Sequence, residues 1–264
     1  MTPKTAFENN FRTAETILKV YQLLVSNGNP TIATELISQV RTLFQAGQEE
    51  ELVFLLNDLF LGVVREHADM RSSFFRPAQL CLFLRQAVVA ACAAIDVYYN
   101  DLLRRNLFKV FLAKQRNFSR KHLGEIKLSL DDYLSIVQDP DPNSRLEQLL
   151  LKHFERKTLS NVEGLTEVLE ILGIERPWLR IAQVVGLPEN SLRQQIQNIV
   201  ARRNDIIHRG DRPAGSPDSD PQPIDYPWTH SHVQAIRNVV LASDELVEQQ
   251  IASLVPPGTL AEEG

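Results

Sequence analysis

The chain has 264 residues, of which 44% are hydrophobic and 23% charged, a composition that excludes a disordered or fibrous protein. Its net charge of −5 at pH 7 excludes a general nucleic-acid coat protein, so any RNA contact must come from a local basic patch. Two cysteines are too few for most structural zinc sites and indicate buried free thiols in a reducing cytosol.

The N-terminal part of the chain is expected to be helical. Its first ten residues carry Lys, Glu and Asn without an apolar run, so we expect no signal peptide and a cytoplasmic protein. Leu and Val recur at helical spacing on both sides of a break at 27–30. This pattern predicts helices at 4–26, 31–46 and 48–67. We assign residues 1–70 to an N-terminal helical extension for dimerisation or partner docking, followed by a linker at 71–77.

An uncharged segment follows, from residue 86 to residue 95. Ten residues without a charge predict a helix buried on nearly all sides. This run is far shorter than the ~20 residues that cross a bilayer, so we expect core and no membrane span. Asp96 follows directly after the segment. Basic residues are frequent in the next stretch of chain, where they form either a solvated helix face or an RNA-binding patch. They are Arg104, Arg105, Lys109, Lys114, Arg116, Arg120, Lys121 and Lys127.

The rest of the chain shows helical periodicity, and nowhere in the chain is there a convincing alternation of a β-strand. Proline-containing breaks at 139–143 and 175–177 separate its segments. His230 and His232 indicate a capping segment or a local metal pair, and we expect no metal site. The sequence predicts an all-α fold that ends in a mobile tail at 256–264. The expected helices are 77–114, 118–124, 129–137, 143–156, 161–172, 177–185, 189–208 and 229–254.

The helix expected at 189–208 carries an arginine in its apolar seam. At about 100° per residue, Arg203 projects within roughly 40° of the direction shared by four apolar side chains, those of Leu192, Ile196, Ile199 and Ile206. Arg202 projects to the margin of that face, where we expect it to reach water. Asn204 and His208 form a second stripe beside the seam. Because a charge in an apolar seam is costly unless paired, Arg203 indicates either an ion pair or a bound anion.

Two segments resemble the HEPN superfamily. Residues 203–208, Arg-Asn-Asp-Ile-Ile-His, stand at a helix end before a glycine, as in the Arg, polar residue and His motif of that superfamily. The helix at 85–103 resembles the early helix of RiboL-PSP-type HEPN domains, with Asp96 where family members often have Glu. The resemblance implies a HEPN-type helical bundle over residues 71–255. It also implies a metal-independent endoribonuclease, usually homodimeric, in which two motifs face each other across a cleft.

The residue types of the motif suit RNA cleavage without a cofactor. RNA supplies its own nucleophile, the 2′-OH. His208 can take that proton or protonate the leaving 5′-oxygen, Arg203 can hold the scissile phosphate, and Asn204 can orient it. The expected products are a 2′,3′-cyclic phosphate and a 5′-hydroxyl. Since acid and base require two groups, a second His208 from a symmetric partner would complete a composite site.

Further residues are assigned supporting or substrate-binding roles. Asp96 is the expected partner of Arg203 or orienter of His208, or else a surface residue without a role. Arg209 supports the site, while Arg202 and Arg212 surround it as candidate RNA contacts. The proline-rich segment at 211–228 cannot be helical. Its Tyr226 and Trp228 either stack on bases or anchor this loop to the core.

Two other functions stay open. The chain could be a non-catalytic interaction module in which Arg203 pairs with Asp96, or a nucleotide-binding domain without cleavage. The HEPN resemblance also suggests a toxin or antiviral defence effector, with an antitoxin or regulatory protein as a partner beside RNA. Ideal helical angles separate Arg203 from His208 by about 140°. The two can therefore act on one phosphate only if the helix end unwinds or a second copy contributes.

Overall fold

A computed structural model describes residues 1–25, 33–48, 50, 52–56, 61–65, 72–113, 126–154, 159–216 and 218–254. The helices are α1 (Pro3–Leu24), α2 (Thr34–Phe44), α3 (Pro77–Ala113), α5 (Leu130–Gln138), α6 (Pro142–Phe154), α7 (Val162–Ile171), α8 (Pro177–Val185), α9 (Glu189–Arg209) and α10 (Tyr226–Leu254). The expected all-α class is confirmed. The expected helix at 118–124 and tail at 256–264 lie outside the described residues.

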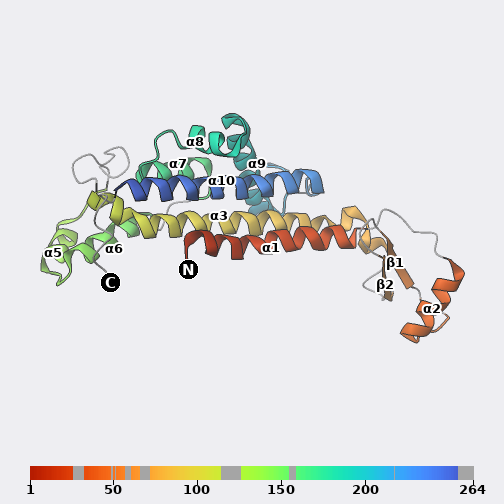
Figure 1. Ribbon diagram of the computed structural model, residues 1–264. Helices are drawn as coiled ribbons and strands as arrows, with labels where there is room; N and C mark the ends of the chain where they lie inside the picture. The colour runs from red at the N-terminus through yellow and green to blue at the C-terminus, as the bar shows by residue number, and fades with distance from the viewer. Residues whose placement is uncertain are drawn as a thin grey trace.

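The long helix α3 forms the axis of the molecule (Figure 1). Helix α1 runs antiparallel beside it, since the side chain of Arg105 reaches the Met1 carbonyl while the Phe7 ring packs edge-on against Tyr98. Helix α10 lies along the same axis, where the Tyr98 hydroxyl donates to Asp244 at 3.1 Å. The three helices share one hydrophobic core.

Helices α7, α8 and α9 lie on α3 and α10, opposite α1 (Figure 1). The inward face of α9 is its apolar stripe, because Leu192, Ile196 and Ile199 are fully buried. The helix ends at Gly210, whose left-handed backbone (φ 60°) lets its N–H bond the Asp205 carbonyl. Packing and capping together fix where the motif at 203–208 stands.

The expected helix at 48–67 is wrong. The structure instead has a β-hairpin of β1 (Leu52–Leu56) and antiparallel β2 (Leu61–Arg65), so the expectation that the chain has no strand is also wrong. Both strands are short apolar runs rich in branched side chains, which fit a strand as well as a buried helix, and Gly62 disfavours a helix. Val53 is buried against Phe75 of the 3-10 helix η1 (Ser72–Phe75), which precedes α3.

One helix boundary needs correction, and the length of α3 bears on the expected absence of a membrane span. The last helix begins at Tyr226, three residues earlier than expected, because proline is tolerated in a first turn and Asp225 accepts the Trp228 N–H at 2.8 Å. Among the described residues, α3 as a whole is long and apolar enough to cross a bilayer, although its uncharged run is not. Its buried residues belong to the common core with α1, α9 and α10.

Candidate active site

Arg202 of α9 is largely shielded from solvent in a cluster of charges, which corrects the expectation that Arg202 reaches water. Its side chain is 14% exposed, and Nη2 donates to Asp211 Oδ2 at 2.9 Å. The same nitrogen donates to the carbonyl oxygens of Gln222 and Pro223, at 2.9 and 3.0 Å. The guanidinium also lies over the Trp228 ring, 5.7 Å from its centroid. The Nη2 donors of Arg202 are thus used within the protein, and its assignment as an RNA contact stays a prediction.

A second arginine completes this charge cluster. Arg85 of α3 places Nε 2.5 Å from Asp211 Oδ2 and donates from Nη2 to the Gln222 carbonyl at 2.9 Å. Asp211 is fully buried, with a left-handed backbone (φ 65°) one residue beyond Gly210. Arg202 Nε lies 2.6 Å from Asp211 Oδ1 without the alignment of a hydrogen bond, so that contact is ionic. The cluster joins α3, the end of α9 and the following loop.

Sequence reasoning did not identify Arg85 or Asp211 as members of one cluster. Two signals point to them in hindsight. Arg85 is the charge that precedes the uncharged run, and Asp211 follows a helix-ending glycine, where Asp tolerates the left-handed conformation.

Arg203 is half-buried, and its guanidinium turns toward the second stripe of α9. Nη1 donates to the side-chain oxygen of Asn204 at 3.1 Å. Asn204 and His208 are both exposed and stand one turn apart on that stripe. This hydrogen bond brings the Arg203 guanidinium to Asn204, which shares its stripe with His208. Arg203, Asn204 and His208 can converge on one surface.

Asp96 does not pair with Arg203, although both lie near Cys92. Burial raises the pKa of the Cys92 thiol to about 12, with Arg203 acting to lower that pKa and Asp96 to raise it. Within the described part of the chain, the Asp96 carboxylate forms no ion pair, and its backbone carbonyl accepts from Asn100. The ion pair expected between Arg203 and Asp96 is therefore not formed in this structure.

The remaining residues near the motif differ in what they contact. His208 is exposed in the last turn of α9 and forms no hydrogen bond with the described residues. Arg209 pairs with Asp205 one turn earlier. Arg212 donates from Nε to the Ser219 carbonyl at 2.9 Å and so organises the loop. These contacts leave the His208 imidazole accessible to a ligand.

The proline-rich loop is fastened to the helix end. The Gln222 N–H donates to the Asp211 carbonyl at 2.8 Å, and the Gln222 side chain donates to Asp205 at 3.2 Å. Ring contacts hold its C-terminal end. Tyr226 stacks with Tyr21 (5.9 Å between centroids) and with His230 (5.5 Å).

Trp228 is likewise engaged within the chain. It stacks on His232, with 4.2 Å between centroids, in addition to its contact with Arg202. With Tyr226 and Trp228 both used in this way, the geometry favours anchoring over base stacking. His230 and His232 each serve as ring partners, and within the described residues no group of three His, Cys, Asp or Glu side chains is placed to hold a metal.

A sequence profile of the RiboL-PSP-HEPN family matches residues 48–247, which is most of the chain. The chain belongs to the RiboL-PSP-HEPN family. The HEPN match includes Asp96, the motif at 203–208, and the cluster of Arg85, Arg202 and Asp211. It begins inside the expected extension at 1–70, and the division at residue 70 stays a prediction. Searches of curated proteins and of solved structures found no match.

Proposed function

We propose that this HEPN protein is a metal-independent endoribonuclease whose catalytic residues are Arg203, Asn204 and His208. The hydrogen bond from Arg203 to Asn204 carries the proposal, because it turns the guanidinium toward the stripe that holds His208. The neighbouring Arg202 is the weaker candidate, because its Nη2 already donates to Asp211 and to the carbonyl oxygens of two loop residues. Arg203 forms no ion pair with the described residues. Its guanidinium can therefore donate two hydrogen bonds to a phosphate.

The chemistry follows from these roles. His208 removes the 2′-OH proton of the substrate, and the oxygen attacks the adjacent phosphorus. Arg203 and Asn204 stabilise the charge that gathers on the phosphorane oxygens. Protonation of the 5′-oxygen then releases a 5′-hydroxyl end and leaves a 2′,3′-cyclic phosphate. Because one protomer offers a single His208 at this surface, a homodimer would bring the second one as the acid.

The proposal extends to cellular context. Cys81 and Cys92 are both free thiols, which agrees with a protein of the reducing cytoplasm. An RNA-cleaving HEPN protein there would act as a toxin or antiviral defence effector, held in check by an antitoxin or regulatory protein.

The decisive experiment is cleavage of mixed RNA in EDTA, followed by end-group analysis. We expect His208→Ala and Arg203→Ala each to lower the rate by about 10²-fold or more, since each removes a group that acts in the transition state. His153→Ala is the matched control for the first, because His153 is also an exposed histidine in the last turn of a helix. Arg193→Ala, an exposed arginine on α9, is the control for the second.

Three outcomes would contradict the proposal. They are cleavage that survives in His208→Ala, cleavage that requires a divalent metal, and products that carry a 3′-hydroxyl end. Circular dichroism melting of all four variants separates a loss of catalysis from a loss of folding.

A further inference from the structure

One face of α3 that reaches solvent carries no charge over the middle of the helix. Leu82 and Val97 are 45% and 40% exposed, and Ala93 between them is exposed as well. With three further side chains they recur every three or four residues, so they form one stripe along the helix. This stripe, the uncharged face of α3, consists of Leu82, Gln86, Val89, Ala93, Val97 and Asn100.

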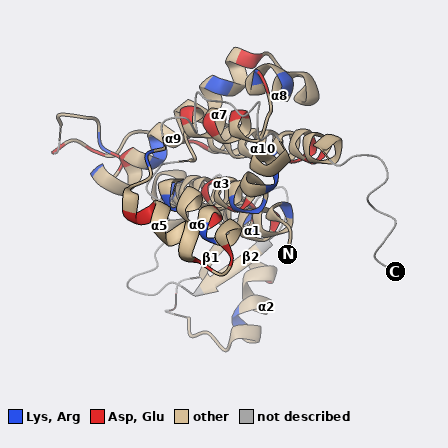
Figure 2. Ribbon diagram, turned by 90° about the vertical axis from the view of Figure 1, so that its left-hand side faces the viewer, with Lys and Arg blue, Asp and Glu red and all other residues tan. Residues whose placement is uncertain are grey.

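The neighbours of α3 leave this face open. Figure 2 looks along the long axis of the molecule and shows α9, α10 and α1 around α3. Helix α10 packs against both α9 and α1. The Cys92 thiol faces the Ile199 carbonyl of α9 at 3.9 Å, and Tyr98 packs on Phe7 of α1. Ala93 points about 100° away from Cys92 and 140° away from Tyr98, so the uncharged face lies between α9 and α1.

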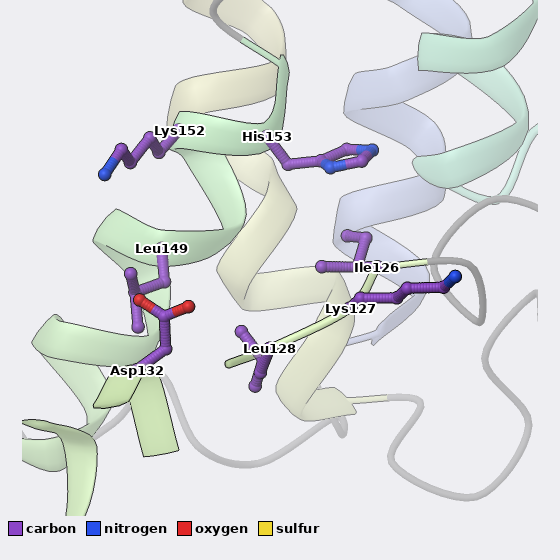
Figure 3. Close-up of a pocket in the computed structure, with 7 residues that line it drawn as sticks. All are labelled: Ile126, Lys127, Leu128, Asp132, Leu149, Lys152 and His153. Carbon is purple, nitrogen blue, oxygen red and sulfur yellow. The ribbon is translucent and has the colours of Figure 1, made fainter. Parts of the chain in front are cut away.

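The lack of charge is local to this face. Charges return on α3 at Arg104 and Lys109. Near that end of the helix, charged side chains also line a cavity of about 380 Å³ beside α6 (Figure 3), among them Lys127, Asp132 and Lys152. A solvated helix ordinarily carries charged or polar side chains on its outer face. An exposed stripe without charge therefore marks a surface that another molecule covers.

A second copy of the chain fits this face when the two α3 helices run antiparallel. The stripe is then symmetric about Ala93, because Val89 faces the partner's Val97 and Gln86 faces the partner's Asn100. The two amides can hydrogen-bond to each other. Ala93 faces its own counterpart, and small side chains at the contact let two helix axes approach closely. The face is thus complementary to itself.

Antiparallel packing also brings the two motifs to the same side of a dimer. Arg203 and Asp96 both lie near Cys92, the residue before Ala93. A two-fold axis that crosses α3 at Ala93 keeps α9 on one side in both copies, whereas parallel packing sets the two α9 helices on opposite sides. The segment behind α9 contacts Arg85, about 12 Å along α3 from Ala93. The charges nearest the axis, Asp96 and Arg203, have opposite signs, which favours association.

We propose that the uncharged face of α3 packs antiparallel against the same face of a second copy, with the two-fold axis at Ala93. This packing places both copies of the motif on one side of the dimer, near the axis. The inference rests on the proposed ribonuclease function, which requires a second His208, and it names the surface that joins the two copies.

The first test is a disulfide across the axis. After mild oxidation, Ala93→Cys should run as a covalent dimer on a non-reducing gel, because two residues on the axis meet within reach of a disulfide. Wild type, with Cys81 and Cys92, should run as a monomer. Leu112→Cys should do the same, since Leu112 is 40% exposed on α3 but its two copies would lie about 57 Å apart.

A mixture of two variants tests the direction of packing. Gln86→Cys chains mixed with Asn100→Cys chains should give a covalent heterodimer, and neither variant should cross-link alone, because equal residues lie about 21 Å apart along the helix. Parallel packing would reverse this result, since each variant would then cross-link to itself. That outcome would overturn the proposed arrangement.

A third variant tests the strength of association. Ala93→Glu sets two carboxylates against each other on the axis and should raise the Kd of the dimer about 100-fold or more, measured by light scattering. Leu112→Glu is the matched control and should leave the Kd unchanged. Since both side chains are exposed, unchanged melting of the variants shows that folding is intact.

The interface and the ribonuclease function fail separately. A dimer that Ala93→Cys does not cross-link and Ala93→Glu does not dissociate overturns this interface and leaves the ribonuclease standing. A cross-linked dimer that cuts no RNA overturns the ribonuclease and keeps the interface. A wild type that stays monomeric and binds phosphatidylcholine vesicles, with binding lost in Ala93→Glu, would make the face a membrane surface and overturn the dimer.

Discussion

His232 shows how one buried side chain links stability to pH. Its Nδ1–H donates to the Trp228 carbonyl at 2.8 Å, its ring stacks on the indole, and within the described chain its Nε2 is buried without a partner. Protonation of Nε2 would place a charge there, so burial lowers the pKa of His232. The neutral imidazole is the form that the fold accommodates.

The sign of the pH effect follows from this lowered pKa. Below the unfolded pKa of about 6.5, the unfolded chain binds a proton that the folded chain resists. The contribution of His232 to stability is therefore complete above that pH and is lost as pH falls toward the folded pKa. We expect His232→Phe to flatten the fall of Tm between about pH 7.5 and 5, measured by circular dichroism. The exposed His230→Phe is the control, and equal slopes in both variants would exclude this role for His232.

At the scale of elements, the buried charge cluster fastens the motif helix to α3. Asp211 accepts from Arg85 and Arg202, and both arginines also donate to the Gln222 carbonyl. A buried carboxylate between two arginines is costly to disrupt, because its removal leaves two charges without a partner. This cluster explains why the end of α9 and its loop keep a fixed position beside the core.

We expect Asp211→Ala to lower the free energy of unfolding by about 3–5 kcal/mol, measured by urea denaturation. The control is Glu189→Ala, which removes an exposed ion pair with Arg193 on the same helix and should cost at most about 0.5 kcal/mol. If Asp211→Ala costs no more than the control, the cluster does not hold the helix end. Arg203→Ala should resemble the control in stability, since its contact with Asn204 is exposed.

At the scale of the whole molecule, the proposed chemistry requires two copies of the chain. The motif offers one His208 per protomer, and acid and base must act on opposite sides of the phosphorus. Two-fold symmetry brings an identical residue to the other side without further catalytic groups. The activity of mixed dimers therefore distinguishes a composite site from two independent sites.

We expect a co-expressed equal mixture of wild-type and His208→Ala chains to retain about one quarter of the wild-type cleavage rate, because random pairing leaves about that fraction with two histidines. Independent protomers would retain about half. Mixtures with the control His153→Ala should keep the full rate. A value near one half, with dimers shown by light scattering, would contradict the composite site.

The fold was largely predictable because helical periodicity and proline breaks are local signals. The expected ranges 129–137, 161–172 and 177–185 agree with α5, α7 and α8 within one residue at each end. The hairpin at β1 and β2 was not predictable in this way, since short apolar runs with branched side chains satisfy both periods. Its placement depends on contact with Phe75, which no local pattern encodes.

The sequence by itself determined the helix that carries the motif, the order of Arg203, Asn204 and His208 on it, and the glycine that ends it. These features depend on spacing along one helix. Only the tertiary structure decided which arginine forms an ion pair, because Arg202 is held by Asp211 together with Arg85, which lies 126 residues before that aspartate. It alone also decided that the apolar stripe of α5 faces solvent, namely Leu130, Tyr133, Leu134 and Val137. Periodicity shows that a helix has an apolar face, whereas the packing of its neighbours determines where that face points.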